Sequence, residues 1–244
     1  MIPDNKALGA VAAEVIEKLR QISVATISGQ LAKRGLRRMF MTNVRPIDSN
    51  LKIVGPAFTL RYIPAREDIT IPQYTSDPET PQRKTVEIAP PGSVVVMDCR
   101  REVWAAGLGG ILSRRLQRRG VEGVVLDGGL RDFTEVEQSG FPVFCCGPAA
   151  PPNNVLHHPI DFDVPIACGA VPVFPGDIIC GDREGVVVIP RYLVEELTED
   201  AFAQEKREVF LLEKVDNGAS IVGVYPPSDE TLRDYEAWKK REGN

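Results

Sequence analysis

The stretch GGILSRRLQRRGVEGVVLDGGLRDF, residues 109–133, decides the fold. After the two opening glycines, apolar residues recur at helical spacing with arginines on the opposite side, which predicts an amphipathic helix. Gly120 ends this helix, because a residue without Cβ enters the left-handed conformation at no steric cost. Residues 121–126 then predict a short buried strand, which ends in a turn at 127–129.

A second apolar run lies just upstream. Residues 93–98, SVVVMD, follow the turn Pro-Pro-Gly and predict another buried strand. Strand, helix and strand in this order form a right-handed crossover with the strands parallel. In such a unit the start of the helix and the exit of the second strand share one edge of the sheet, where open α/β sheets bind ligands. We therefore expect the backbone at 109–112 to lie near the loop 128–132.

The residue types at this edge indicate an anion and a metal. Free N–H groups at the positive end of a helix favour an anion. The start of the predicted helix offers them at four consecutive residues, Gly109, Gly110, Ile111 and Leu112. Arg131 carries a planar guanidinium that pairs with carboxylates, and Asp132 is a hard oxygen ligand suited to Mg²⁺ or Mn²⁺. An Arg-Asp pair at a strand exit also occurs as a plain surface salt bridge, but the glycine turns in register favour a pocket for a small oxo acid and a divalent metal.

Length and charge narrow the class of protein. A chain of 244 residues suits one substantial domain. The net charge of -5 argues against nucleic acid as the main ligand, and the helical arginines are interpreted as a solvated face. No apolar run approaches the roughly 20 residues of a membrane span. The first residues lack the features of a signal peptide, so we expect a cytoplasmic protein without membrane contact.

The remaining chain predicts further elements around this centre. Amphipathic spacing predicts helices, at 4–20, 23–34, 192–215 and 230–240. Short apolar runs between turn residues predict strands, at 53–62, 141–145, 171–173, 177–180 and 186–189. Gly55-Pro56 indicates a bulge or an edge feature in the first of these strands.

The sequence leaves the roles of two segments undecided. Residues 64–87 contain Pro72, Pro78 and Pro81 among charges and predict a long irregular loop, which is compatible with a lid, an oligomer contact or a solvated surface. His157 and His158 are the only histidines. Neighbouring side chains on an extended segment point to opposite sides, so a shared metal is not expected and structural roles are favoured.

The stretch 109–133 resembles the signature of the RraA-like family, the 4-hydroxy-4-methyl-2-oxoglutarate aldolases and the regulator of ribonuclease activity A. SVATISGQLAKRG, VGPAFTLRY, PPGSVVVMD and VPVFPGDIICGDREGVVVIP extend the resemblance over about residues 23–190. It implies an α/β fold, a swivelling β/β/α sandwich of mixed sheets with flanking helices. The whole chain 1–244 is then one RraA-like domain, with a C-terminal helix and tail at 191–244. Homotrimers or hexamers with sites at subunit borders are also implied.

The resemblance also implies a reaction. It is the metal-dependent cleavage of a 4-hydroxy-2-oxo diacid of the 4-hydroxy-4-methyl-2-oxoglutarate type to pyruvate, with oxaloacetate decarboxylation as a second activity. Arg131 carries over as the catalytic and substrate-binding residue, the backbone at 109–112 as the carboxylate site, and Asp132 as the metal ligand. No lysine lies between 109 and 132, so a Schiff base has no candidate there.

Two departures from the family pattern keep an alternative open. Gly110 stands where aldolase-like members usually have Asp or Glu, and Gly29 stands where Ser-Asp-Ala is usual. Losing such an acid can cost roughly 10–100-fold in metal affinity or activity. Glu102 and Asp127 are nearby acids that could substitute. The alternative is a non-catalytic regulatory or binding protein that keeps the RraA-like fold.

Overall fold

The structure is a computed structural model that describes residues 5–242. Its helical segments are η1 (Asn5–Leu8), α1 (Ala13–Leu19), α2 (Val24–Lys33), α3 (Pro72–Ser76), α4 (Pro81–Ile88), α5 (Gly110–Arg118), α6 (Phe133–Gln138), η2 (Asn153–Val155), η3 (Arg191–Leu193), α7 (Val194–Asp216) and α8 (Asp229–Glu242). Its strands are β1 (Arg45–Pro46), β2 (Ile53–Pro64), β3 (Val94–Asp98), β4 (Ala106–Leu108), β5 (Gly123–Leu126), β6 (Gly129–Leu130), β7 (Val143–Cys145), β8 (Gly147–Pro148), β9 (His157–Phe162), β10 (Ile166–Cys168), β11 (Val171–Val173), β12 (Ile178–Asp182) and β13 (Gly185–Ile189).

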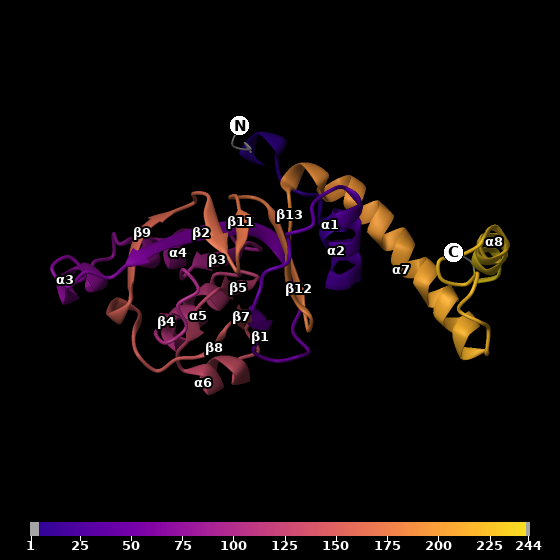
Figure 1. Cartoon of the computed structure of the whole chain (residues 1–244). Coiled ribbons are helices and arrows are strands. Elements are labelled where there is room, and N and C mark those ends of the chain that lie inside the picture. The colour runs from indigo at the N-terminus through magenta and orange to yellow at the C-terminus, as the bar shows by residue number, and fades with distance from the viewer. Residues whose placement is uncertain (1–4, 243–244) are drawn as a thin grey trace.

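The main sheet mixes parallel and antiparallel strands. Its order is β1-β7-β5-β3-β2-β12-β13, and β9 also pairs with β2. The long strand β2 joins its two parts, because its first residues pair antiparallel with β12 and its middle pairs parallel with β3. A three-stranded parallel sheet, β4-β6-β8, and the hairpin β10-β11 complete the body (Figure 1). The predicted fold class, α/β with mixed sheets and flanking helices, is confirmed.

Apolar residues cover both faces of the central strands. In β3, Val95 and Met97 pack with the cluster that includes Leu116 of α5. Val94 and Val96 belong to a second cluster on the other face, which takes in the β10-β11 hairpin. Burial on both faces explains why this strand is a continuous apolar run rather than an alternating one.

The predicted crossover is confirmed. Strands β3 and β5 are parallel neighbours, with Val94 opposite Gly123. Helix α5 lies between them in sequence, and Gly120 follows it with a φ of +78°. Of the apolar residues whose spacing predicts this helix, Ile111, Leu112 and Leu116, Ile111 does not lie on the buried face. Its side chain is 84% exposed, and Ser113 and Leu116 form the buried face instead.

Two other expectations need correction. The helix expected at 4–20 begins outside the described residues, and its described part is interrupted by Gly9, where the φ of +70° ends η1 before α1 begins. The irregular loop expected at 64–87 contains α3 and α4. Pro72 and Pro81 occupy first-turn positions of these helices, where proline removes no needed N–H group and its fixed φ suits the helix.

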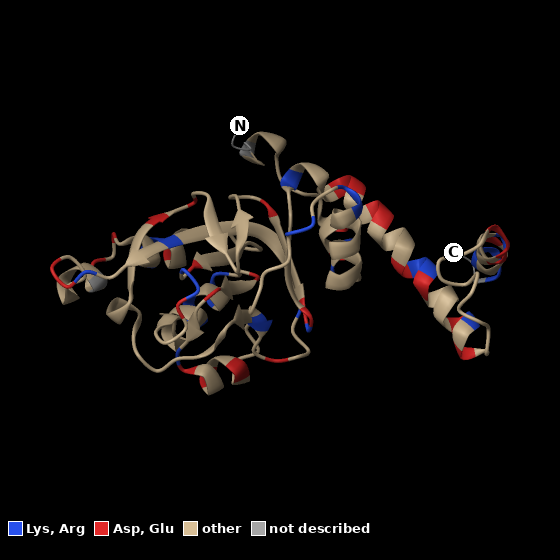
Figure 2. Ribbon diagram, viewed as in Figure 1, with Lys and Arg blue, Asp and Glu red and all other residues tan. Residues whose placement is uncertain are grey.

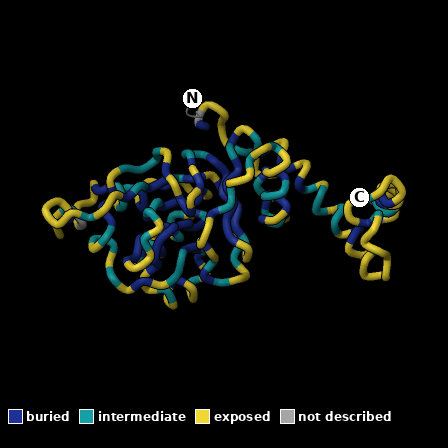
Figure 3. The backbone as a smooth tube through the Cα atoms, viewed as in Figure 1, coloured by how far each residue is buried: buried dark blue, intermediate teal, exposed yellow. Residues whose placement is uncertain are grey.

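The C-terminal part forms an arm. Helix α7 begins against α1 and α2 and then runs away from the body, and α8 packs on its far end (Figure 1). Phe210 and Tyr235 hold the two helices together, with ring centroids 5.6 Å apart. Exposed residues dominate this arm and charges of both signs line it (Figures 2 and 3). No helix within residues 5–242 is long and apolar enough to cross a bilayer.

Candidate active site

A pair of very short parallel strands aligns the predicted site residues. Leu108 at the end of β4 lies opposite Leu130 at the end of β6, and the Arg131 amide donates to the Leu108 carbonyl at 2.9 Å. The turn expected at 127–129 is therefore partly strand. Gly129 is required there, because a Cβ at this position would lie 2.4 Å from the Ala149 Cβ.

Asp132 connects this strand exit to helix α5. Its carboxylate oxygen Oδ2 accepts a hydrogen bond from the Gly110 amide at 3.0 Å. The residue adopts a left-handed conformation with a φ of 56°, which aspartate tolerates better than most residues. The carboxylate thus lies at the positive end of α5, where a negative charge is stabilised.

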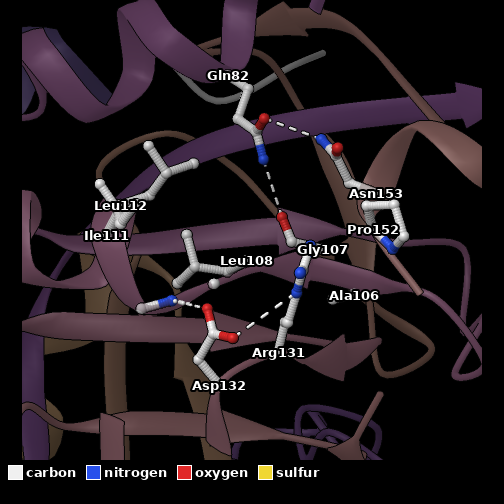
Figure 4. A pocket seen from close by; sticks show the side chains of 12 residues that line it. Gln82, Ala106, Gly107, Leu108, Ile111, Leu112, Arg131, Asp132, Pro152 and Asn153 are labelled. Carbon is white, nitrogen blue, oxygen red and sulfur yellow. Dashed lines mark hydrogen bonds and ion pairs between the residues drawn. The ribbon is translucent and has the colours of Figure 1, made fainter. Parts of the chain in front are cut away.

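The predicted site residues surround one cavity of about 280 Å³ (Figure 4). Its lining is Gln82, Ala106, Gly107, Leu108, Gly109, Gly110, Ile111, Leu112, Arg131, Asp132, Pro152 and Asn153. The expected approach of the helix start to the second strand exit is confirmed. The catalytic, substrate-binding and metal-binding roles of these residues stay predictions.

One end of the cavity suits an anion. The Gly110 amide already donates to Asp132, whereas the amides of Ile111 and Leu112 have no acceptor within residues 5–242. The half-exposed Arg131 side chain lines the same cavity on the other side of the Asp132 carboxylate, with its Nε 3.6 Å from Asp132 Oδ1 (Figure 4). Two free amides and a guanidinium match a single carboxylate or a developing oxyanion.

The donor set beside the cavity fits a weakly anchored divalent metal. Residues 5–242 contain no group of three or more His, Cys, Asp or Glu side chains that could hold an ion. Among residues 5–242, Asp132 is the one carboxylate in the cavity lining, and the separation of 3.6 Å leaves its Oδ1 without a hydrogen bond from Arg131. Magnesium commonly keeps several waters and takes one or two protein carboxylates plus substrate oxygens, so this set fits Mg²⁺ or Mn²⁺ but not a fully protein-ligated metal.

Another acid lies beside Gly110. A Cβ on Gly110 would lie 3.3 Å from Oε2 of Glu135, in the first turn of α6, and 3.3 Å from the Asp132 Cβ. Sequence reasoning missed Glu135, although its position three residues after Asp132 is a recognisable helix-start spacing. The two acids considered from the sequence, Glu102 and Asp127, do not line the cavity.

Asp127 accepts backbone hydrogen bonds in the interior of the protein. Its carboxylate is buried and accepts from the amides of Cys99 at 2.7 Å and Gly169 at 3.1 Å. Burial raises the pKa of Asp127 to about 6. Gly29 also lies away from the cavity, within α2, where a Cβ would point into open space.

Two amide side chains that the sequence did not single out line the far wall. Gln82 of α4 donates through Nε2 to the Gly107 carbonyl at 2.9 Å and to the Tyr62 hydroxyl at 2.8 Å. Its Oε1 accepts from Nδ2 of Asn153 at 2.9 Å (Figure 4). Sequence reasoning missed Gln82 because residues 64–87 were expected to form an irregular loop, and no pattern singled out Asn153.

The histidines lie in β9 and do not line the cavity. His157 packs against Tyr62 with ring centroids 5.3 Å apart, and His158 stacks on Tyr74 at 4.3 Å. Burial lowers the pKa of both imidazoles. Their surroundings are those of packed core side chains.

Comparison with known proteins identifies the family. The family model RraA-like, described as Aldolase/RraA, matches residues 24–188. The chain belongs to the RraA-like family. The match covers the central crossover and both cavity-lining stretches around 109 and 131.

Individual RraA-like relatives carry two kinds of name. A putative 4-hydroxy-4-methyl-2-oxoglutarate aldolase of Halalkalibacterium halodurans is 32% identical over 190 residues, which is 77% of this chain and 82% of the relative. The solved structure of Streptomyces coelicolor RraAS2, described as an unusual member of the RNase ES inhibitor RraA protein family, is 31% identical. It has a TM-score of 0.74 and covers 82% of this chain and 96% of its own. An uncharacterized protein from Pseudomonas syringae pv. tomato shares the fold at 23% identity, with a TM-score of 0.79 over 88% of this chain and 94% of its own.

Proposed function

We propose that this RraA-like protein is a divalent-metal-dependent carbon–carbon lyase. It cleaves a 4-hydroxy-2-oxo acid of the 4-hydroxy-4-methyl-2-oxoglutarate type to pyruvate, and it also decarboxylates oxaloacetate. One observation carries the proposal: the free amides of α5, Arg131 and Asp132 line a common cavity. The name of the H. halodurans relative supports the choice of reaction.

The reaction divides into tasks that these residues can perform. In the cleavage the C4 hydroxyl gives its proton to water and its electron pair forms the C4=O bond. The C3–C4 bond breaks, its electron pair forms the C2=C3 bond, and the π pair of the C2 carbonyl moves onto the C2 oxygen. A proton from water then adds to C3 of this enolate and gives pyruvate. The amides of Ile111 and Leu112 bind the C1 carboxylate, and Arg131 stabilises the negative charge that develops on the C2 oxygen. A preorganised donor of this kind contributes about 3–4 kcal/mol in the transition state.

Asp132 is the residue that would hold the metal. A bound divalent ion supplies Lewis-acid polarisation of the substrate carbonyl. Oxaloacetate loses carbon dioxide with the same movement of electrons onto the C2 oxygen. One arrangement of Arg131 and the helix amides therefore serves both reactions.

Pyruvate release tests the proposal. Purified protein is assayed with Mg²⁺ or Mn²⁺ on 4-hydroxy-4-methyl-2-oxoglutarate and on oxaloacetate, with lactate dehydrogenase and NADH reporting pyruvate. Arg131→Ala should lose nearly all of the activity, whereas Arg118→Ala, an exposed arginine of α5 outside the cavity lining, should retain it. Wild-type rates no higher than those of Arg131→Ala would exclude the lyase.

We also propose that the protein acts as a homotrimer or hexamer with the cavities at subunit borders. The supporting observation is Ile111, a large apolar side chain on the cavity rim that is 84% exposed in the single chain. Covering such a side chain is favourable, since burial removes apolar surface from water.

A regulatory or binding protein is the second candidate. The supporting observations are the family described for S. coelicolor RraAS2 and the missing acid at Gly110. It predicts inhibition of a purified RNase E-type ribonuclease that Asp132→Ala leaves unchanged. Metal-dependent pyruvate release together with a lack of ribonuclease inhibition would reject it.

A further inference from the structure

We propose that Asn153 presents a hydrogen-bond acceptor to a hydroxyl group on the substrate and thereby selects ligands with a hydroxyl at C4. The inference rests on the proposed function for the identity of the substrate, and it assigns the far wall of the same cavity. Asn153 is half-buried and lines the cavity on the side opposite Asp132 (Figure 4).

The orientation of this amide follows from a fixed carbonyl group. The Gly107 carbonyl can only accept hydrogen bonds, so the group of Gln82 that lies 2.9 Å from it must be the NH₂ group. The carbonyl of Gln82 then faces Asn153. Because a carbonyl needs a donor, the NH₂ group of Asn153 must face Gln82, at 2.9 Å.

Tyr62 fixes the same polarity independently. Its buried hydroxyl donates to the Gly107 carbonyl at 3.1 Å and accepts from Gln82 at 2.8 Å. Burial raises the pKa of Tyr62 well above its ordinary value, so the phenol keeps its proton and remains a donor. Both N–H bonds of Gln82 and its oxygen are therefore engaged, and the side chain has no freedom to flip without losing them.

The consequence is an acceptor at the far wall. The Asn153 carbonyl oxygen faces away from Gln82, and it has no donor within residues 5–242. A hydroxyl on the ligand can donate to this oxygen, whereas the C4 carboxylate of oxaloacetate can only accept. Oxaloacetate should therefore bind without this hydrogen bond and more weakly than a 4-hydroxy acid. A ligand that leaves this half-buried acceptor unpaired therefore binds more weakly, by about the free energy of one hydrogen bond.

The two ends of the cavity therefore favour different groups of the ligand. The amides of Ile111 and Leu112 with Arg131 attract the carboxylate, and Asn153 accepts from the hydroxyl. A 2-oxo acid with a hydroxyl at C4 presents a carboxylate at one end and a hydroxyl donor toward the other. Gln82 is a positioning residue, because it acts on the ligand through Asn153.

Binding of three non-cleavable acids tests this assignment. The probes are 2-hydroxypentanoate, 2,4-dihydroxypentanoate and 2-hydroxyglutarate, which lack the 2-oxo group that must take up the electron pair. Titration calorimetry with Mg²⁺ should show 2,4-dihydroxypentanoate binding roughly 3- to 10-fold more tightly than 2-hydroxypentanoate, the range of one hydrogen bond. It should also bind more tightly than 2-hydroxyglutarate. Equal affinities of the wild-type protein for the three acids, or a preference for 2-hydroxyglutarate, would overturn the proposal.

Variants separate recognition from general damage. Asn153→Leu and Gln82→Leu should abolish the preference for the 4-hydroxyl while leaving 2-hydroxypentanoate binding within about twofold. Asn154→Leu, the neighbouring amide outside the cavity lining, should keep the preference. A preference that persists in Asn153→Leu overturns the assignment. Pyruvate release without a hydroxyl preference would refute this subsite alone, and a hydroxyl preference without pyruvate release would refute the lyase alone.

Discussion

Replacing Asp132 with asparagine separates its two assignments, the cap on α5 and the metal ligand. Asparagine keeps the size of the side chain, tolerates the left-handed conformation at a φ of 56°, and still offers an oxygen to the Gly110 amide at 3.0 Å. What it loses is the charge. The hydrogen bond becomes neutral and the favourable interaction with the positive end of α5 is removed, which together cost about 1 kcal/mol for a partly exposed group.

The metal-dependent effect should be larger. At 100 times its dissociation constant, an ion that binds only the folded state contributes about 2.7 kcal/mol. For a chain of this size 1 kcal/mol shifts Tm by roughly 2–4 °C, so saturating Mg²⁺ or Mn²⁺ should raise the wild-type Tm by roughly 5–11 °C. Asp132→Asn should lower Tm by roughly 2–4 °C without metal and should show no rise with metal.

Thermal unfolding followed by circular dichroism, with and without metal, measures both effects. Glu137→Gln is the matched control, since it removes an exposed carboxylate from α6 that does not line the cavity. A metal-induced rise of equal size in wild type and Asp132→Asn would refute the assignment of Asp132. Lack of any rise in the wild type would contradict the metal dependence itself.

Three further outcomes follow from the same geometry. Gly110→Asp should not raise pyruvate release, because its Cβ would lie 3.3 Å from Glu135 Oε2 and its carboxylate would be the third beside those of Asp132 and Glu135. Repulsion among them should lower the free energy of unfolding in urea by about 1 kcal/mol or more, and added salt should partly restore it. Burial raises the pKa of Asp127 to about 6, so ionisation of this carboxyl opposes folding. The free energy of unfolding of wild type, relative to Asp127→Asn, should therefore increase by up to about 3 kcal/mol as the pH falls from 7.5 to 4. A difference in urea unfolding that stays constant over this pH range would contradict this. Ile111→Glu should shift the proposed oligomer toward monomer in size-exclusion chromatography with light scattering, and an unchanged mass would count against Ile111 as a contact.

The central crossover could be predicted because its signals are local. Val94–Met97 and Gly123–Leu126 are uninterrupted apolar runs, and a glycine with positive φ ends the helix between them. The order of these elements allows essentially one handedness. The crossover alone therefore predicts that Arg131 and Asp132 lie near the start of α5, and no long-range contact is needed for this prediction.

The crossover alone does not hold Arg131 and Asp132 at the start of α5. The two strands that set the register, β4 and β6, have three and two residues. Periodicity cannot identify elements so short. Their pairing depends on close backbone approach, as at Gly129, whose missing side chain makes room for Ala149. Such contacts join residues distant in sequence and leave no local pattern.

The far wall was missed for a related reason. The prolines in the first turns of α3 and α4 occur equally in loops, so residues 64–87 were expected to be irregular. Gln82 and Asn153 then meet across 71 residues of chain, and their partners are chosen by tertiary packing. No local sequence pattern predicts a hydrogen-bonded pair of this kind.

Backbone groups set the polarity at both ends of the cavity. At one end the amides of Ile111 and Leu112 are free because they begin a helix, and at the other the Gly107 carbonyl orients Gln82 and through it Asn153. The side chain at position 110 belongs to neither arrangement. Its amide is engaged by Asp132, and Glu135 already places a carboxylate beside it. The loss of an acid at Gly110 therefore leaves the recognition of a hydroxylated oxo acid intact.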